Sequence, residues 1–170
     1  MEITTANIDD VPSLVLLINS AYRGEASKKG WTTEADLLEG DLRTDVKSLT
    51  ALMNKPGAVI LKYTKPEGII SGCVFLEKQK RGLYLGMLSV SPLEQAVGTG
   101  KQLMQAAEAY AKQNNCSTIF MKVISVRHEL MSWYERQGFY KTNEVQPYTD
   151  IKFGTPKQPI EFIVLQKDLN

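Results

Sequence analysis

Residues 83–111 decide the fold of this 170-residue chain, and they read LYLGMLSVSPLEQAVGTGKQLMQAAEAYA. The apolar run over residues 83–90 predicts a strand that is buried on both faces. Pro92 ends that strand, because proline has no N–H to donate to a neighbouring strand. After a glycine-bearing turn, apolar residues recur at helical spacing and predict a helix over residues 99–113.

The turn between this strand and this helix has the chemistry of an anion site. Gly98 and Gly100 permit backbone conformations that other residues avoid, and they let a ligand approach closely. The first N–H groups of the helix have no partner inside the helix, and they lie at the positive end of its dipole. We therefore expect a phosphate or a diphosphate to bind here.

Three phosphate-binding motifs compete for this turn. Walker A, G-x-x-x-x-G-K-[ST], aligned on Gly100, meets Gln95 and Gln102 where it needs glycine and Ser/Thr. The dinucleotide fingerprint G-x-G-x-x-G meets Leu103 in place of its last glycine. The pattern [QR]-x-x-G-x-[GA] fits Gln95, Gly98 and Gly100, and here the chain resembles the GNAT acetyltransferase superfamily, whose coenzyme-A loop has this form. Taken alone, the loop fits a plain strand-to-helix connection equally well.

A second block decides between these two interpretations. Residues 117–139 read STIFMKVISVRHELMSWYERQGF, which predicts a strand over residues 119–124 and a helix that ends near Gln137. Gly138 is a typical helix stop. The final YERQGF resembles the Y-E-x-x-G-F signature of the same superfamily. Two motifs in the right order and spacing make the resemblance specific.

The rest of the chain is predicted from its periodicity and its turn residues. Further strands are predicted over residues 2–5, 58–63, 69–77, 139–145 and 160–166. Further helices are predicted over residues 33–39 and 45–53, and a first one is predicted with Asn7 as its cap, Asp9 and Asp10 in its first turn and apolar spacing from Val11 to Tyr22. This element order resembles the superfamily over about residues 1–145. The resemblance implies the GNAT acyl-CoA N-acyltransferase fold: an α+β protein with a mixed sheet, in which residues 1–170 form a single three-layer α-β-α domain.

Composition and charge argue against several classes of protein. The net charge of +1 gives no bulk attraction to nucleic acid or to a membrane surface, and no apolar run approaches the length of a membrane span. The N-terminus has neither the basic region nor the apolar core of a secretory signal. Two cysteines, Cys73 and Cys116, indicate a reducing compartment and no disulfide framework. We expect a cytoplasmic protein with no nucleic-acid or membrane partner; a homodimer is compatible with the sequence.

The resemblance implies that acetyl-CoA is the co-substrate and that its acetyl group passes directly to an amine acceptor. The strand before the loop would separate from the next parallel strand and bind the pantetheine arm through its backbone. The N–H of Leu88 or of a neighbour could also polarise the thioester oxygen. The implied cofactor-binding residues are Leu88, Ser89, Val90, Gln95, Ala96, Val97, Gly98, Thr99, Gly100 and Lys101.

Tyr134, in the second motif, is the implied general acid. A phenol has an ordinary pKa of about 10, so it keeps its proton at neutral pH and can give it to the departing sulfur. The alternative is a tyrosine that only packs against the sheet. Many superfamily members carry a cofactor-binding asparagine seven positions earlier, where this chain has Arg127. Arg127 is expected either to pair with a phosphate of the cofactor or to lie exposed.

The acceptor side is less defined. Glu25 and Glu77 are the candidate general bases, and a chain of water molecules is the alternative. His128 begins its helix, where a capping or surface role is expected, and one histidine with two distant cysteines predicts no metal site. The predicted acceptor-side residues are Tyr22, Glu25, Trp31 and Glu77, with Tyr148 as a further aromatic wall.

A second function would carry the same loop. A non-catalytic acyl-CoA-binding sensor or regulatory module needs the diphosphate seat but not the tyrosine, so Tyr134 favours the enzyme. The acceptor does not follow from the sequence: a small amine, an amino acid, an antibiotic and a protein N-terminus all fit a chain of balanced charge.

Overall fold

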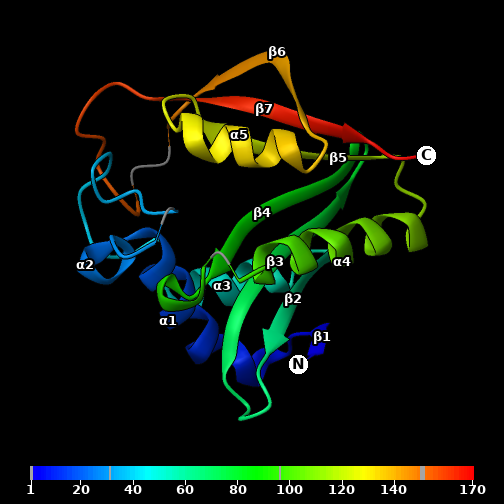
Figure 1. Cartoon of the computed structure of the whole chain (residues 1–170), viewed down its shortest axis with the longest axis horizontal. Coiled ribbons are helices and arrows are strands. Elements are labelled where there is room, and N and C mark those ends of the chain that lie inside the picture. Colours follow the sequence, from blue (N-terminus) through cyan, green and yellow to red (C-terminus); the bar gives the residue numbers. More distant parts are fainter. Residues whose placement is uncertain (1, 31, 96, 150–151) are drawn as a thin grey trace.

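The computed structural model describes residues 2–30, 32–95, 97–149 and 152–170 (Figure 1). Within these residues the chain forms one seven-stranded sheet in the order β1-β2-β3-β4-β5-β7-β6. The strands are β1 (Glu2–Thr5), β2 (Ala58–Thr64), β3 (Ile70–Gln79), β4 (Gly82–Val90), β5 (Thr118–Ile124), β6 (Tyr140–Pro147) and β7 (Glu161–Asp168). The helices are η1 (Ile8–Asp10), α1 (Val11–Tyr22), α2 (Gly24–Ser27), α3 (Val46–Met53), η2 (Pro92–Glu94), α4 (Thr99–Gln113) and α5 (His128–Arg136).

The sheet is mixed, as predicted. Strands β1 to β4 form an antiparallel meander, and α4 then carries the chain across to β5, which runs parallel to β4. Strand β7 pairs with β5 and β6, antiparallel to both. One parallel junction therefore lies in the middle of an otherwise antiparallel sheet.

Helices cover both faces of the sheet, which confirms the three-layer arrangement. Because side chains alternate along a strand, Cys73 and Phe75 of β3 face one layer, where they pack with α1 and α3. Val74 and Leu76 face the other layer, where they pack with α4 and α5. The buried residues Leu103 of α4 and Tyr134 of α5 belong to that same core cluster.

One predicted helix is wrong. Residues 33–39 form turns rather than a helix, and Leu38 makes an isolated β-bridge with Pro156. The N–H of Glu34 donates to the carbonyl of Tyr22 at 2.7 Å. Backbone groups of this polar segment thus bond to residues that are distant in the sequence, and the sequence of the segment does not reveal these partners. The short helix α2 was not predicted from the sequence.

Strands β4 and β5 pair at their starts and then separate. Their parallel register holds for two pairs of residues, Leu83–Ile119 and Tyr84–Phe120. Beyond them Met87, whose φ is 50°, lies in a β-bulge that bends β4. Figure 1 shows the two strands diverging from this junction. The sheet is therefore split at the position where the sequence resemblance implies a bound pantetheine arm.

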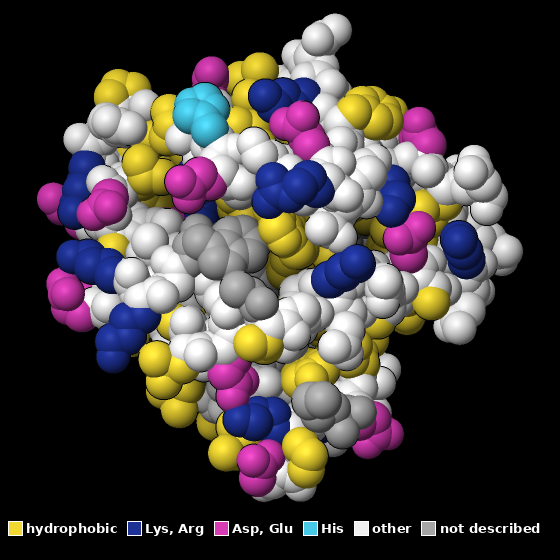
Figure 2. Space-filling view, viewed as in Figure 1, with side chains coloured by type: hydrophobic (Ala, Val, Ile, Leu, Met, Phe, Trp, Pro, Cys, Tyr) yellow, Lys and Arg dark blue, Asp and Glu magenta, His cyan; other side chains and the backbone are white. Residues whose placement is uncertain are grey.

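Charges of both signs are interspersed on the face seen in Figure 2, without one large basic or acidic patch. Among the described residues, no helix has the length and apolar character needed to span a membrane.

Candidate active site

A cavity of about 660 Å³ lies beside the N-terminus of α4, and we call it the loop cavity. The helix begins after Gly98, whose φ of 91° is a left-handed conformation that glycine adopts without strain. The first hydrogen bond of the helix joins the Gln102 N–H to the Gly98 carbonyl at 3.0 Å. The N–H groups of the three residues between them therefore have no partner inside the helix and remain for a ligand.

The lining of the loop cavity suits an anion that carries apolar parts. Lys101 and Arg136 supply positive charge, and Glu129 is the acidic group among the described residues of the lining. The Trp133 ring lies close to the helix start: a Cβ added to Gly100 would be 3.5 Å from it. Backbone donors, two cations and an aromatic ring thus surround one space, which fits a diphosphate attached to an apolar chain.

The Gln95 side chain holds the loop in place. Its amide nitrogen donates to the Thr32 hydroxyl and to the Val90 carbonyl, both at 3.0 Å. A Cβ on Gly30 would come within 2.3 Å of this side chain, so glycine is required there for the contact. The glutamine of the motif therefore ties the loop to the end of β4 and to the segment after α2.

The other predicted loop residues differ in their surroundings. Thr99 is buried, Val97 and Lys101 are exposed, and Ala96 lies outside the described residues. Ser89 is fully buried, and its hydroxyl donates to the Met87 carbonyl at 2.9 Å, within the bulge. The side chain of Ser89 is thus used inside the protein, and the residue is also paired with Cys73 of β3 in the sheet.

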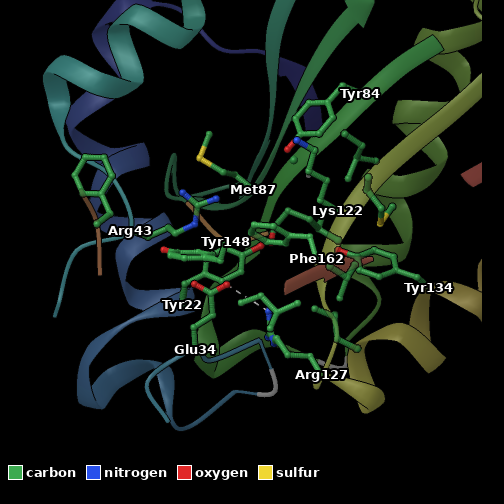
Figure 3. Close-up of a pocket in the computed structure, with 18 of the residues that line it drawn as sticks. Tyr22, Glu34, Arg43, Tyr84, Met87, Lys122, Arg127, Tyr134, Tyr148 and Phe162 are labelled. Carbon is green, nitrogen blue, oxygen red and sulfur yellow. Dashed lines mark hydrogen bonds and ion pairs between the residues drawn. The ribbon is translucent and has the colours of Figure 1, made fainter. Parts of the chain in front are cut away.

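A second cavity, of about 160 Å³, lies where β4 and β5 separate, and we call it the gap cavity (Figure 3). Both cavities border α5 and the end of β4, and they share no described lining residue. The residues that line the gap cavity include Tyr22, Glu34, Leu88, Arg127, Tyr134 and Tyr148.

Tyr134 projects from α5 into the gap cavity and is 5% exposed. Its ring packs edge-on against Trp133 and Phe139, with centroids 5.2 and 6.0 Å away. Its hydroxyl makes no hydrogen bond within the described part of the chain. Burial raises the pKa of Tyr134 above its ordinary value, and the positive charge of Arg127 acts in the opposite direction. The phenol is therefore protonated at neutral pH and has no competing acceptor among these residues.

Tyr22 reaches the same cavity from the end of α1. Its hydroxyl donates a hydrogen bond to the Leu88 carbonyl. Burial raises the pKa of Tyr22, and Tyr134 and Glu34 act in the same direction. Because the N–H and C=O of one residue in an extended strand point to the same edge, the Leu88 N–H also faces the gap.

A buried ion cluster lines part of the gap cavity. Arg23, 3% exposed, donates from Nε to Glu34 Oε1 at 3.0 Å and from Nη1 to the carbonyls of Leu42 and Phe153. Glu34 Oε2 lies 3.6 Å from Arg127 Nη1. One arginine thus ties together the end of α1, the segment of residues 34–42 and the loop before β7.

We expect Arg23→Met to lower the free energy of unfolding by about 3 kcal/mol, because it removes one partner of a buried, hydrogen-bonded ion pair. Urea unfolding followed by circular dichroism measures this change. Lys28→Met is the control, since Lys28 pairs with Glu25 at an exposed site and should leave the midpoint unchanged. Equal midpoints for the two variants would contradict the structural role of Arg23.

Two predicted acceptor-side carboxylates do not reach the gap cavity. Glu25 is exposed and pairs with Lys28 at 3.0 Å, while Glu77 pairs with Lys55 at 3.2 Å on the far side of the β4 bulge. Trp31 lies outside the described residues. The structure brings Arg127 to the gap cavity and not to the loop cavity, in which the exposed His128 lies instead.

Sequence reasoning missed Glu34, Arg43 and Lys122, which all line the gap cavity. The Arg43 guanidinium lies over the Tyr22 ring, 5.8 Å from its centroid. No local pattern marks these residues, because each occupies a polar or strand segment without a motif. The described residues contain no group of three or more His, Cys, Asp or Glu side chains placed to hold a metal ion.

A mixed sheet that splits between two parallel strands, with a glycine-bearing helix start beside the split, is the arrangement of the acyl-CoA N-acyltransferase fold. The sequence profile described as "Acetyltransferase (GNAT) family" matches residues 18–139, well over half of the chain. The chain therefore belongs to the GNAT acetyltransferase family. No curated protein gives a significant sequence match to it.

Solved structures of low sequence identity share this fold. The ribosomal-protein-alanine N-acetyltransferase of Brucella melitensis superposes with a TM-score of 0.73 at 16% identity, over 99% of this chain and 100% of that one. The ribosomal-protein-S18-alanine N-acetyltransferase of Escherichia coli gives 0.73 at 14% identity, over 99% and 94%. The yncA protein of Salmonella typhimurium, solved with its cofactor acetyl-CoA, gives 0.71 at 16% identity, over 100% and 94%.

Proposed function

We propose that this protein transfers the acetyl group of acetyl-CoA directly to the nitrogen of an amine. The observation that carries the proposal is the separation of β4 and β5 after Tyr84, beside the N-terminus of α4, with Tyr134 inside the gap. Both unpaired cysteines suit a reducing compartment, so the cytoplasm is the proposed location.

The loop cavity would hold the diphosphate of the co-substrate. The free amides at the start of α4, with Lys101 and Arg136, supply the donors and the positive charge. The edge of β4 at Leu88, which β5 leaves unpaired, would bind the pantetheine arm as an added strand, and the Leu88 N–H would donate to the thioester oxygen. Tyr22 binds the Leu88 carbonyl and so helps to hold the β4 backbone at the edge where that N–H lies.

Tyr134 is the proposed general acid. The exchange forms one C–N bond and breaks one C–S bond. Tyr134 gives its proton to the departing sulfur, and the nitrogen loses a proton as it becomes an amide nitrogen, so the proton count balances. The Tyr134 hydroxyl suits this role because it is protonated at neutral pH. It also makes no hydrogen bond in the described part of the chain, so its proton is available.

The charge of the gap cavity favours a reactive amine. Arg23, Arg43, Lys122 and Arg127 line it together with one described carboxylate, that of Glu34. Positive neighbours favour the neutral form of an amine, which is the nucleophilic form. A dedicated base is thus not required, and a water molecule can carry away the proton of the amine.

Release of free thiol tests the proposal. The purified protein is incubated with acetyl-CoA and a panel of amines, and thiol is followed with a chromogenic disulfide reagent. We expect thiol release that depends on both protein and amine, with acetylated amine confirmed by mass spectrometry. Calorimetric binding of acetyl-CoA without turnover across the panel would favour the sensor or regulatory module.

The pH profile should rise and then stay level to about pH 10. Activity increases with pH as the amine loses its proton, while burial keeps the pKa of Tyr134 above the ordinary phenol value of about 10. The acid form thus persists at every pH below that value, and any decline caused by Tyr134 must begin above it. A decline of kcat near pH 8 in a folded sample would contradict Tyr134 as the acid.

A further inference from the structure

We propose that the amine acceptor carries a carboxylate and that Arg127 and Arg43 bind this group in the gap cavity. This inference rests on the acetyl transfer proposed above and specifies the acceptor class that the same site takes.

Arg127 provides the first observation. Its side chain is 9% exposed, and its Nη1 lies 3.6 Å from Glu34 Oε2. Its Nη2 is buried and has no hydrogen-bond partner in the described part of the structure. A buried donor of a charged group that stays unpaired is costly, so such a group in a cavity marks the place of a missing acceptor. The planar guanidinium matches a carboxylate, which can accept two parallel hydrogen bonds.

The balance of charge around the gap cavity is the second observation. Glu34 is the acidic residue in the described lining, and Arg23 already occupies its Oε1 at 3.0 Å. Arg43 and Lys122 form no ion pair with any described residue. Figure 3 shows Arg43 beside the rings of Tyr22 and Tyr148. The lining therefore has an excess of positive charge that an anionic ligand would neutralise.

The size of the cavity limits the acceptor. Its volume of about 160 Å³ is below the roughly 300–1,000 Å³ of cavities that hold drug-sized ligands. Tyr148 and Phe162, with ring centroids 5.5 Å apart, close one side. A small amino acid fits these limits: its carboxylate pairs with the arginines while its amine lies toward Leu88 and Tyr134.

The test compares acceptors that differ only in the group at the position of the carboxylate. Amino acids, their carboxamides and the corresponding aminophosphonates are assayed for thiol release with acetyl-CoA. We expect kcat/KM for the acids to exceed that for the amides by about 10- to 100-fold, the range of a charge-assisted hydrogen bond in a buried site. A preference for the phosphonates over the acids would assign the site to a phosphorus oxyanion and overturn the carboxylate.

Two variants test which residues produce the preference for acids over amides. Arg127→Gln and Arg43→Gln should each lower the ratio of kcat/KM for the acid to kcat/KM for the amide about 10-fold or more, and leave the acetyl-CoA Kd unchanged. Arg43 is only half-buried, so its variant remains informative if Arg127→Gln unfolds. Lys80→Gln, at an exposed turn, is the matched control and should retain the full preference. Loss of acetyl-CoA affinity alone would instead make Arg127 a cofactor ligand and overturn the proposal.

Binding separates this proposal from the proposed function. Calorimetry on protein saturated with coenzyme A measures the preference for acid over amide without turnover. A preference without any thiol release supports the anion site and rejects acetyl transfer. Thiol release at equal kcat/KM for acids and amides rejects the anion site and leaves acetyl transfer intact.

Discussion

Tyr134→Phe is expected to lower kcat by about 10²- to 10⁴-fold, the usual contribution of a general acid, with little change in the Kd of acetyl-CoA. The substitution removes one hydroxyl from a side chain that lines the gap cavity and leaves its ring contacts with Trp133 and Phe139. Because that hydroxyl has no hydrogen-bond partner among the described residues, its loss should cost little stability. Steady-state kinetics and calorimetry on the same preparation measure the two effects.

Two other tyrosines serve as controls for this prediction. Tyr110→Phe, on α4 and away from both cavities, should retain full activity. Tyr22→Phe removes the hydrogen bond to the Leu88 carbonyl, so it should affect how the thioester is held more than how the sulfur is protonated. Near-normal turnover of Tyr134→Phe, with a large loss in Tyr22→Phe, would transfer the acid role to Tyr22.

Gly100→Glu is expected to weaken acetyl-CoA binding by roughly 100- to 1,000-fold. Two unit charges 4 Å apart near a protein surface repel by about 4 kcal/mol, and the new carboxylate would lie where the diphosphate is proposed to bind. Gly100 is in the first turn of α4, where a negative charge and a better helix former than glycine both favour the helix. The protein should therefore unfold at the same temperature or higher while it loses its co-substrate.

Gly100→Ala separates charge from bulk, since an added Cβ would meet the Trp133 ring only at an ordinary contact distance of 3.5 Å. This variant should gain similar helix stability and lose much less affinity. Gln113→Glu makes the same change of net charge at the exposed end of α4, away from both cavities, and tests the effect of net charge. Calorimetric titration and a thermal melt of each variant provide the measurements. Unchanged acetyl-CoA affinity in Gly100→Glu would place the diphosphate elsewhere.

Local sequence patterns were sufficient to predict the strand and the helix that form the loop cavity. The helix predicted over residues 99–113 is observed as Thr99–Gln113, because its apolar spacing and its glycine-bearing start are both local features. The strand predicted over residues 83–90 is observed one residue longer, as Gly82–Val90. The helix predicted over residues 33–39 was wrong, because that polar segment is held by distant partners such as Pro156.

The sequence by itself determined the layered fold and the position of Tyr134, since hydrophobic periodicity and two short motifs are written in consecutive residues. Only the tertiary structure decided what surrounds that tyrosine. Glu34, Arg43 and Arg127 come from three separate segments, and they meet because β5 leaves β4 after two residue pairs and opens a space between them. The charge of the gap cavity is the sum of the charges of residues that are far apart in the chain. No periodicity or motif along the chain could therefore predict it.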